Sequence, residues 1–185
     1  MAVERVERLL LDFTGVVGAA GIDYAVVGGN AVAVWVATVD EGAVRSTKDV
    51  DVLVRRDDLA RIAEAVRSID LTPLEVLGVH MFVDRENPSP KTGVHLVFAG
   101  ERIRPEYRHL APDVAQSEMS PSGFRVVDLA ALVAMKLQAY RFIDRAHIVD
   151  MLGVGLIDDA VRTSIPPDLL QRLDAIETSR DEQTH

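Results

Sequence analysis

Two residue pairs in the first third of the chain combine types suited to binding phosphate and metal. Gly28 and Gly29 close the short apolar run that begins at Tyr24, and Asp49 and Asp51 alternate with valines. Glycines lack Cβ atoms, so backbone N–H groups can approach a phosphate at a helix N-terminus, where the helix dipole also favours an anion. Two carboxylates at i and i+2 of a strand point the same way and supply hard oxygen ligands for Mg²⁺. Either pair alone is typical of a turn or a solvated strand face, but together they predict metal-assisted phosphoryl or nucleotidyl transfer.

The hydrophobic pattern predicts the elements that must position these residues. Apolar residues at helical spacing predict an N-terminal helix that ends near residues 18–21. The run from Tyr24 to Gly28 is too short for a helix and predicts a buried strand. Residues 31–39 are expected to form the following helix. Residues 48–54 alternate between polar and apolar, which predicts a strand with Asp49 and Asp51 on one face.

The remaining elements extend this pattern into an α/β (α+β) fold. Further helices are expected at 59–69, 128–140 (with Asp128 as its cap), 143–152, 158–162 and 166–177, and further strands at 76–83, 93–98 and 124–127. We therefore expect a mixed sheet flanked by helices in an α/β domain over residues 1–120. A helical C-terminal part over 121–177 packs on this domain, and 178–185 is expected to be a frayed tail.

The glycines and carboxylates stand in a recognisable order. Val27-Gly28-Gly29 followed by Asp49-Val50-Asp51-Val52 resembles the signature of the nucleotidyltransferase superfamily, whose fold is that of DNA polymerase beta. The longer form, with Gly28-Gly29-Asn30-Ala31 and then residues 45–51 (RSTKDVD), looks like the abortive-infection type nucleotidyltransferase toxins of toxin–antitoxin systems. It is also similar to the small-molecule antibiotic nucleotidyltransferases. The resemblance implies a nucleotidyltransferase-like fold, an NTP as substrate and Mg²⁺ (or Mn²⁺) as cofactor.

The resemblance also implies roles for individual residues. Asp49 and Asp51 would bind the metal and orient the NTP, and Gly28, Gly29 and Asn30 would hold its β- and γ-phosphates. Arg45 and Thr47 precede the carboxylates and would either hold the loop or touch phosphate. Lys136 opens a Lys-Leu-Gln-Ala segment and would neutralise the triphosphate; on local pattern alone, a lysine at the edge of the core is equally consistent.

Two histidines depart from the family's pattern. The strand expected to supply a third carboxylate reads Gly-Val-His-Leu-Val-Phe and places His95 there. An imidazole can accept a proton near neutral pH but cannot bridge metal ions as a carboxylate does. Asp84 and Glu101 are nearby alternatives that spacing does not select. His147 stands where the resemblance implies the first acid of an Asp-x-x-Asp segment.

Composition excludes several other classes. The 185 residues contain no cysteine, so thiolate catalysis, a disulfide framework and Cys-ligated zinc are all excluded. The formal net charge of −9 argues against a double-stranded DNA-binding protein. No apolar run approaches the length of a membrane span, which predicts a cytoplasmic protein without membrane contact. The basic run from Arg102 to His109 is interpreted as a solvated loop rather than a tRNA or phosphate site.

Three functions therefore remain open. One is a toxin that transfers an NMP to the hydroxyl of tRNA or another RNA and has a cognate antitoxin protein as partner. The second is an enzyme that modifies a small-molecule acceptor, which the acidic charge favours because such acceptors are often cationic. The third is a pseudo-enzyme that binds nucleotide or protein, and the presence of His95 instead of a carboxylate favours it.

Overall fold

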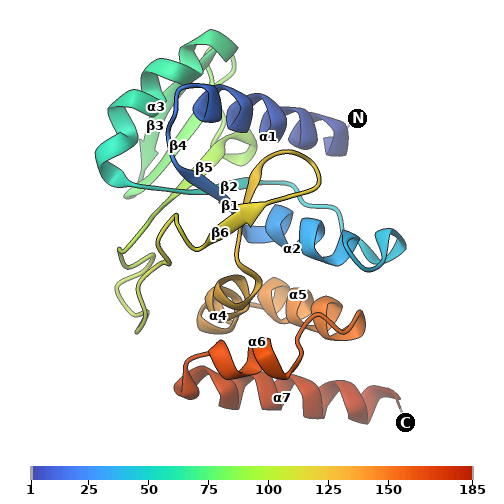
Figure 1. Cartoon of the computed structure of the whole chain (residues 1–185). Helices are drawn as coiled ribbons and strands as arrows, with labels where there is room; N and C mark the ends of the chain where they lie inside the picture. The colour runs from blue at the N-terminus through green and yellow to red at the C-terminus, as the bar shows by residue number, and fades with distance from the viewer. Residues whose placement is uncertain (1, 185) are drawn as a thin grey trace.

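A computed structural model describes residues 2–184 and shows helices stacked in layers on both faces of a sheet (Figure 1). Helices α1 (Ala2–Ala19) and α3 (Leu59–Ala65) cover one face of a central sheet, and α2 (Gly28–Ala37), α4 (Leu129–Ala139) and α5 (Phe142–Gly153) cover the other. Helices α6 (Asp159–Ser164) and α7 (Pro167–Thr184) pack outside α4 and α5 as the last layer. The expected fold class is confirmed.

Seven strands form one mixed sheet in the order β3-β4-β5-β2-β1-β7-β6. Their bounds are β1 Tyr24–Val27, β2 Val50–Val54, β3 Leu71–Val76, β4 Val79–Asp84, β5 Val94–Phe98, β6 Ser117–Met119 and β7 Arg125–Val127. Strand β2 runs antiparallel to β1 and parallel to β5, and β1 runs parallel to β7. Because β7 pairs with β1 and β6, the expected boundary at residue 120 falls inside the β6–β7 hairpin.

The alternating pattern of β2 separates two hydrophobic cores. Val50, Val52 and Val54 pack on the side of α1 and α3, whereas Leu53 packs on the side of α2, α4 and α5. Asp51 has the same parity as Leu53 and therefore faces the α2 side. The parity of β2 thus decides which layer of the molecule can hold a site.

Several predicted boundaries were wrong for identifiable reasons. Helix α2 begins at Gly28 rather than residue 31, and β2 begins at Val50, so Asp49 immediately precedes the strand. Strand β3 was missed; it is an edge strand that contains Pro73, which sequence rules count against a strand. The expected strand at 76–83 is instead the turn and second arm of the β3–β4 hairpin.

The C-terminal part also differs in detail from the prediction. Helix α7 continues to Thr184, so residues 178–184 are helical rather than frayed. Asp128 occupies the N-cap position of α4, but its side chain makes no capping hydrogen bond, and burial raises the pKa of its carboxyl. No helix among residues 2–184 is long and apolar enough to cross a membrane.

Candidate active site

Gly28 and Asp51 meet at the centre of the sheet. Strands β1 and β2 pair Val27 with Asp51, which puts the Asp51 carboxylate beside the first turn of α2. A Cβ added to Gly28 would lie 2.1 Å from Asp51 Oδ2, and Gly28 has φ +69°, a conformation that L side chains rarely adopt. Only glycine satisfies both constraints without displacing the carboxylate. The site therefore brings a helix N-terminus and a carboxylate into direct proximity.

The segment before β2 is fastened to α2 and α5 rather than left as a free loop. Asn30 is buried and donates from Nδ2 to the Asp49 carbonyl oxygen at 2.7 Å. Thr47 Oγ1 lies 3.3 Å from the same carbonyl. Arg45 makes two hydrogen bonds, at 2.8 and 2.9 Å, to the carboxylate of Asp150 on α5. In this structure the side chains of Asn30 and Arg45 thus hold the segment that carries Asp49.

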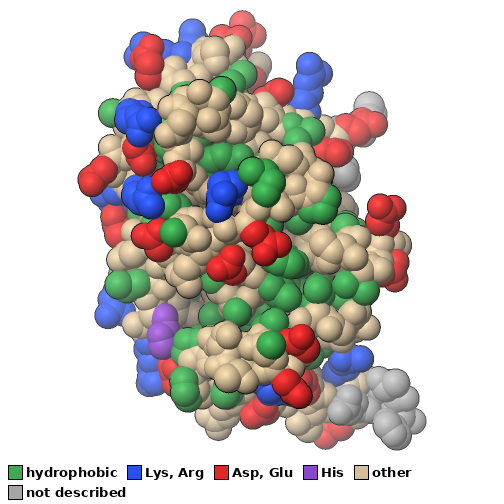
Figure 2. Space-filling view, viewed as in Figure 1, with side chains coloured by type: hydrophobic (Ala, Val, Ile, Leu, Met, Phe, Trp, Pro, Cys, Tyr) green, Lys and Arg blue, Asp and Glu red, His purple; other side chains and the backbone are tan. Residues whose placement is uncertain are grey.

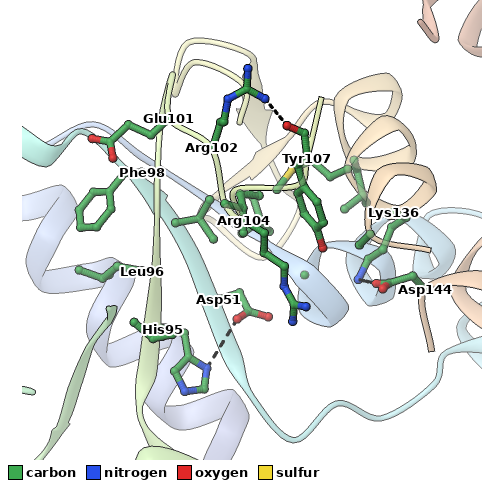
Figure 3. A pocket seen from close by; sticks show the side chains of 18 of the residues that line it. Asp51, His95, Leu96, Phe98, Glu101, Arg102, Arg104, Tyr107, Lys136 and Asp144 are labelled. Atoms are coloured by element: carbon green, nitrogen blue, oxygen red, sulfur yellow. Dashed lines mark hydrogen bonds and ion pairs between the residues drawn. The ribbon is translucent and has the colours of Figure 1, made fainter. Parts of the chain in front are cut away.

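His95 lies directly beside Asp51 in the sheet. The parallel pairing of β2 with β5 aligns the two residues, and His95 Nδ1 is 3.6 Å from Asp51 Oδ1 (Figure 3). The other ring nitrogen, Nε2, lies 2.8 Å from the carbonyl oxygen of Pro90. The Asp51 carboxylate raises the pKa of His95 above its ordinary value, and the Pro90 carbonyl adds to this shift. The imidazole therefore retains its proton to higher pH than a free histidine.

Lys136 is part of a buried ion-pair cluster. Its Nζ lies 3.0 Å from Asp144 Oδ1, and the two side chains are only 7% and 1% exposed. Arg141 donates from Nε to Asp144 Oδ2 at 2.7 Å and from its backbone N–H to the same oxygen. Burial opposes ionisation of Asp144, but the hydrogen bonds from Arg141 and the charge of Lys136 outweigh it and lower its pKa. Two cations share one carboxylate, so the cluster carries one net positive charge.

A cavity of about 370 Å³ joins these groups (Figure 3). Its polar lining includes Asp51, His95, Arg104, Tyr107, Lys136 and Arg141, with Gly28 at its base. In Figure 3 the side chain of Arg104 extends into the space between Asp51 and Tyr107. Leu96, Phe98 and Val79 give the same cavity an apolar wall. The cavity thus has a side rich in cationic groups and an apolar side.

Sequence reasoning missed several of these lining residues. Arg104 was assigned to a solvated loop, and Tyr107 was not considered. Asp144 was overlooked because its partner Lys136 lies eight residues away on another helix. The Arg141-x-x-Asp144 spacing at the start of a helix was the one local signal available. Among the predicted residues, Gly28, Asp51, His95 and Lys136 line the cavity, whereas Gly29, Asn30, Arg45, Thr47 and Asp49 do not.

His147 is a buried neutral group behind Gly29. Its Cε1 would lie 3.6 Å from a Cβ on Gly29, and its Nδ1 has no hydrogen-bond partner among the described residues. Burial, reinforced by the charge of Lys136, lowers the pKa of His147 to about 4. At neutral pH this side chain therefore carries no charge, unlike the acid that the resemblance implies at this position.

The donor set suits a divalent metal held jointly with a nucleotide. Within residues 2–184 no group of three His, Asp or Glu side chains is arranged to hold an ion without help. Asp49 and Asp51 provide carboxylates at the start of β2, and the bare backbone at Gly28 leaves room beside Asp51. Mg²⁺ commonly takes one or two protein carboxylates and completes its octahedron with phosphate oxygens and water. The residues present fit this mode of binding.

The fold is similar to that of solved nucleotidyltransferase-like structures. The antibiotic-resistance factor ANT(2'')-Ia, solved in solution, matches with a TM-score of 0.57 over 100% of this chain and 95% of that one, at 10% identity. An antigenic nucleotidyltransferase-like protein from Paracoccidioides brasiliensis matches with a TM-score of 0.55 over 95% and 94%, at 16% identity. The sequence matches no known family and no curated protein. The likeness at these identities concerns the fold.

Proposed function

We propose that the protein transfers a nucleoside monophosphate from an NTP to the hydroxyl group of an acceptor. The observation that carries this proposal is the contact between Gly28 and Asp51, where a Cβ would lie 2.1 Å from the carboxylate, at the base of a partly cationic cavity. A helix N-terminus that touches a carboxylate is unfavourable for binding an anion alone. The same arrangement is favourable when a divalent cation lies between carboxylate and phosphate.

The residues divide the work as follows. The backbone N–H groups of Gly28 and Gly29 bind the terminal phosphates, and Lys136 and Arg104 offset their charge from the opposite wall. Asp49 and Asp51 would hold Mg²⁺, which when bound polarises phosphoryl oxygens and neutralises developing charge. The acceptor oxygen attacks the α-phosphorus, a new P–O bond forms, and the bond to the β-phosphate oxygen breaks to release pyrophosphate. His95 in its neutral form takes the hydroxyl proton.

The chemical class of the acceptor distinguishes the two enzyme functions that remain open, a toxin and an antibiotic-modifying enzyme. An RNA acceptor corresponds to a toxin, and a cognate antitoxin is then its protein partner. A small-molecule acceptor corresponds to an antibiotic-modifying enzyme, and the likeness to ANT(2'')-Ia, an antibiotic-resistance factor, supports that alternative. Incubation of the protein and a radiolabelled NTP with bulk RNA or with an aminoglycoside, followed by detection of labelled product, separates the two.

Calorimetric titration of ATP, GTP, CTP and UTP, first with Mg²⁺ and then with EDTA, tests the proposed site. We expect at least one nucleotide to bind in the presence of Mg²⁺ and to lose most of its affinity in EDTA. Asp49→Ala and Asp51→Ala should abolish this metal-dependent binding, whereas Asp57→Ala, an exposed carboxylate near the end of β2, should not change it. Equal binding by all four proteins would overturn the assignment.

His95 favours a second candidate function, that of a nucleotide-binding protein without transfer activity. His95, which pairs with Asp51 in the sheet, carries an imidazole and therefore supplies no third carboxylate for the metal. This second candidate would be favoured if the wild type binds an NTP with metal but releases no pyrophosphate from it in the presence of any acceptor, while the His95→Asp variant does release pyrophosphate. Release by the wild type would exclude it.

A further inference from the structure

The lysines and arginines of this chain differ in whether a neighbouring group interacts with them. On the face seen in Figure 2, acidic and basic side chains lie beside one another rather than in a patch of one sign. Most lysines and arginines in the described part of the chain make a hydrogen bond, an ion pair or a ring contact. Three described cations make none, namely Arg5, Lys48 and Lys91. An acidic protein has thus left three cations without a neutralising partner.

These three cations line one groove. Arg5 comes from α1, Lys48 from the segment before β2, and Lys91 from the short helical turn η4 (Pro90–Thr92) before β5. The groove has a volume of about 520 Å³, and Val6, Leu9 and Val50 form its apolar wall. Because β2 and β5 are adjacent parallel strands, the segments before them lie side by side at one edge of the sheet. The chain therefore gathers its unpaired cations at a single place.

The groove adjoins the candidate active site through the segments that line it. Thr47 lines the groove and contacts the Asp49 carbonyl oxygen, and a Cβ on Gly29 would lie 2.8 Å from the Thr47 hydroxyl. Pro90, which begins η4, holds His95 through its carbonyl oxygen. The groove lies on the α1 side of the sheet, since it includes Val50, whereas Asp51 faces the other side. The two sites thus share an edge and remain separate spaces.

We propose that this groove binds the phosphodiester backbone of a single-stranded nucleic acid and so guides the strand to the carboxylates. The inference rests on the proposed function, because it assigns the acceptor to a chemical class. Three unpaired cations from separate elements would attract the successive phosphates of a strand. The same cations would repel a cationic small-molecule acceptor. None of the described residues that line the groove is aromatic, so the contact would be with the backbone and not with the bases. A cationic small-molecule acceptor has no complementary charge in this groove.

Fluorescence anisotropy with labelled ten-nucleotide oligouridylate and oligothymidylate tests the proposal. We expect the wild type to bind at least one oligomer, and the triple variant Arg5→Gln/Lys48→Gln/Lys91→Gln to bind it at least about tenfold more weakly. Because each neutralised phosphate contributes about 0.7 to the slope of log affinity against log salt for single strands, the slope should fall by about 2 in the variant. Calorimetry should show unchanged Mg²⁺-dependent ATP binding in the same variant.

A second triple variant controls for net charge. Arg8→Gln/Arg67→Gln/Arg85→Gln removes the same charge from exposed side chains outside the groove and should leave oligomer affinity within about twofold of wild type. Equal weakening by both triples, or no binding by the wild type, would overturn the groove. Displacement of the oligomer by inorganic tripolyphosphate at equal phosphate concentration would also overturn it, because the groove would then be a polyphosphate site and not a site for a phosphodiester backbone.

The Asp51→Ala variant keeps the two proposals distinguishable. It should lose Mg²⁺-dependent ATP binding and retain oligomer binding that depends on the three cations. Absence of ATP binding in the wild type, with cation-dependent oligomer binding intact, would reject the proposed transfer and retain the groove. Intact ATP binding with oligomer affinity unaffected by the triple variant would reject the groove and retain the transfer.

Discussion

Single residues at the centre of the sheet have little freedom to change. Gly28 combines a left-handed backbone with a contact that leaves no space for a Cβ, and His95 is held between a carboxylate and a carbonyl oxygen. The first constraint is steric and the second electrostatic, so they respond to different perturbations. Stability measurements report the first, and titration reports the second.

Replacement of Gly28 by alanine should damage both fold and site. An L residue at φ +69° loses roughly 1–2 kcal/mol, and the new methyl group would also push Asp51 Oδ2 away from its position. We expect a loss of about 1–2 kcal/mol in the free energy of urea unfolding and loss of Mg²⁺-dependent NTP binding. Gly15→Ala in α1 is the matched control, since nothing lies within 4 Å of its Cβ position, and it should stabilise the protein by about 0.5–1 kcal/mol. Equal stability of the two variants would contradict this reading.

The Asp51–His95 pair should make stability depend on pH. The folded-state pKa of His95 is raised, so its contribution is fully present below the ordinary pKa of about 6.5 and is lost as pH rises through the folded value. In metal-free buffer, the wild type should therefore exceed His95→Gln in stability by more at pH 5.5 than at pH 8.5. NMR titration should show the His95 pKa falling in Asp51→Asn. A stability difference independent of pH would refute the coupling.

At the scale of elements, the site depends on contacts between helices that are distant in sequence. The first turn of α2 and the start of β2 place Gly28 and Asp51 on one side of the cavity. The α4–α5 hairpin brings Lys136 and Asp144 to the same cavity. Arg45 joins the two by binding Asp150 on α5. The position of α5 therefore affects both walls of the cavity.

Removal of the Lys136 ammonium should be strongly destabilising. Lys136→Met leaves the buried Asp144 carboxylate with Arg141 as its remaining cation, and breaking a buried pair commonly costs about 3–5 kcal/mol. We expect a loss toward the lower end of this range, because Arg141 stays in place. Arg67→Met breaks an exposed pair with Glu64 and should change stability by less than about 1 kcal/mol. Urea unfolding of both variants measures the difference, and similar losses would contradict it.

The sequence predicted the elements that carry strong periodicity and missed those that depend on tertiary partners. The N-terminal helix and β5 were predicted because their apolar residues repeat regularly, and β1 because it is a short, fully apolar run. Strands β3 and β6 were missed because they lie at the sheet edges, where pairing rather than composition makes the strand. Asp144 was missed for the same reason, since its importance comes from Lys136 on another helix.

For the whole molecule, the N-terminal and C-terminal halves share one sheet and one buried hydrophobic cluster. Strand β7 pairs with β1 inside the sheet, and Trp35 of α2 donates from Nε1 to the Val127 carbonyl oxygen at 3.0 Å. Leu169, Leu173 and Ile176 of α7 belong to the same buried cluster as Val27 and Leu53 of the sheet. An α/β domain without these residues would leave one edge of β1 unpaired and would expose the apolar side chains that pack against them on the α2 side of the sheet.

A fragment of residues 1–120 should therefore fail to fold. We expect no cooperative thermal transition by circular dichroism, because β1 lacks its parallel partner and the α2 side lacks α4 and α5. Residues 1–177 retain Leu169, Leu173 and Ile176 and should unfold in one transition, as should the full chain. A single cooperative transition in the shorter fragment would show that the α/β part is an independent domain.

The alignment of Asp51 with His95 has a consequence for how this site changes over generations. Histidine and aspartate codons differ at one base, and the shorter aspartate side chain would stand beside Asp51 on the same parallel strand pair without any shift of backbone. The exchange would forfeit the hydrogen bond to the Pro90 carbonyl and the favourable contact with the Asp51 carboxylate. A carboxylate-bearing and an imidazole-bearing version of the site are therefore one point mutation apart.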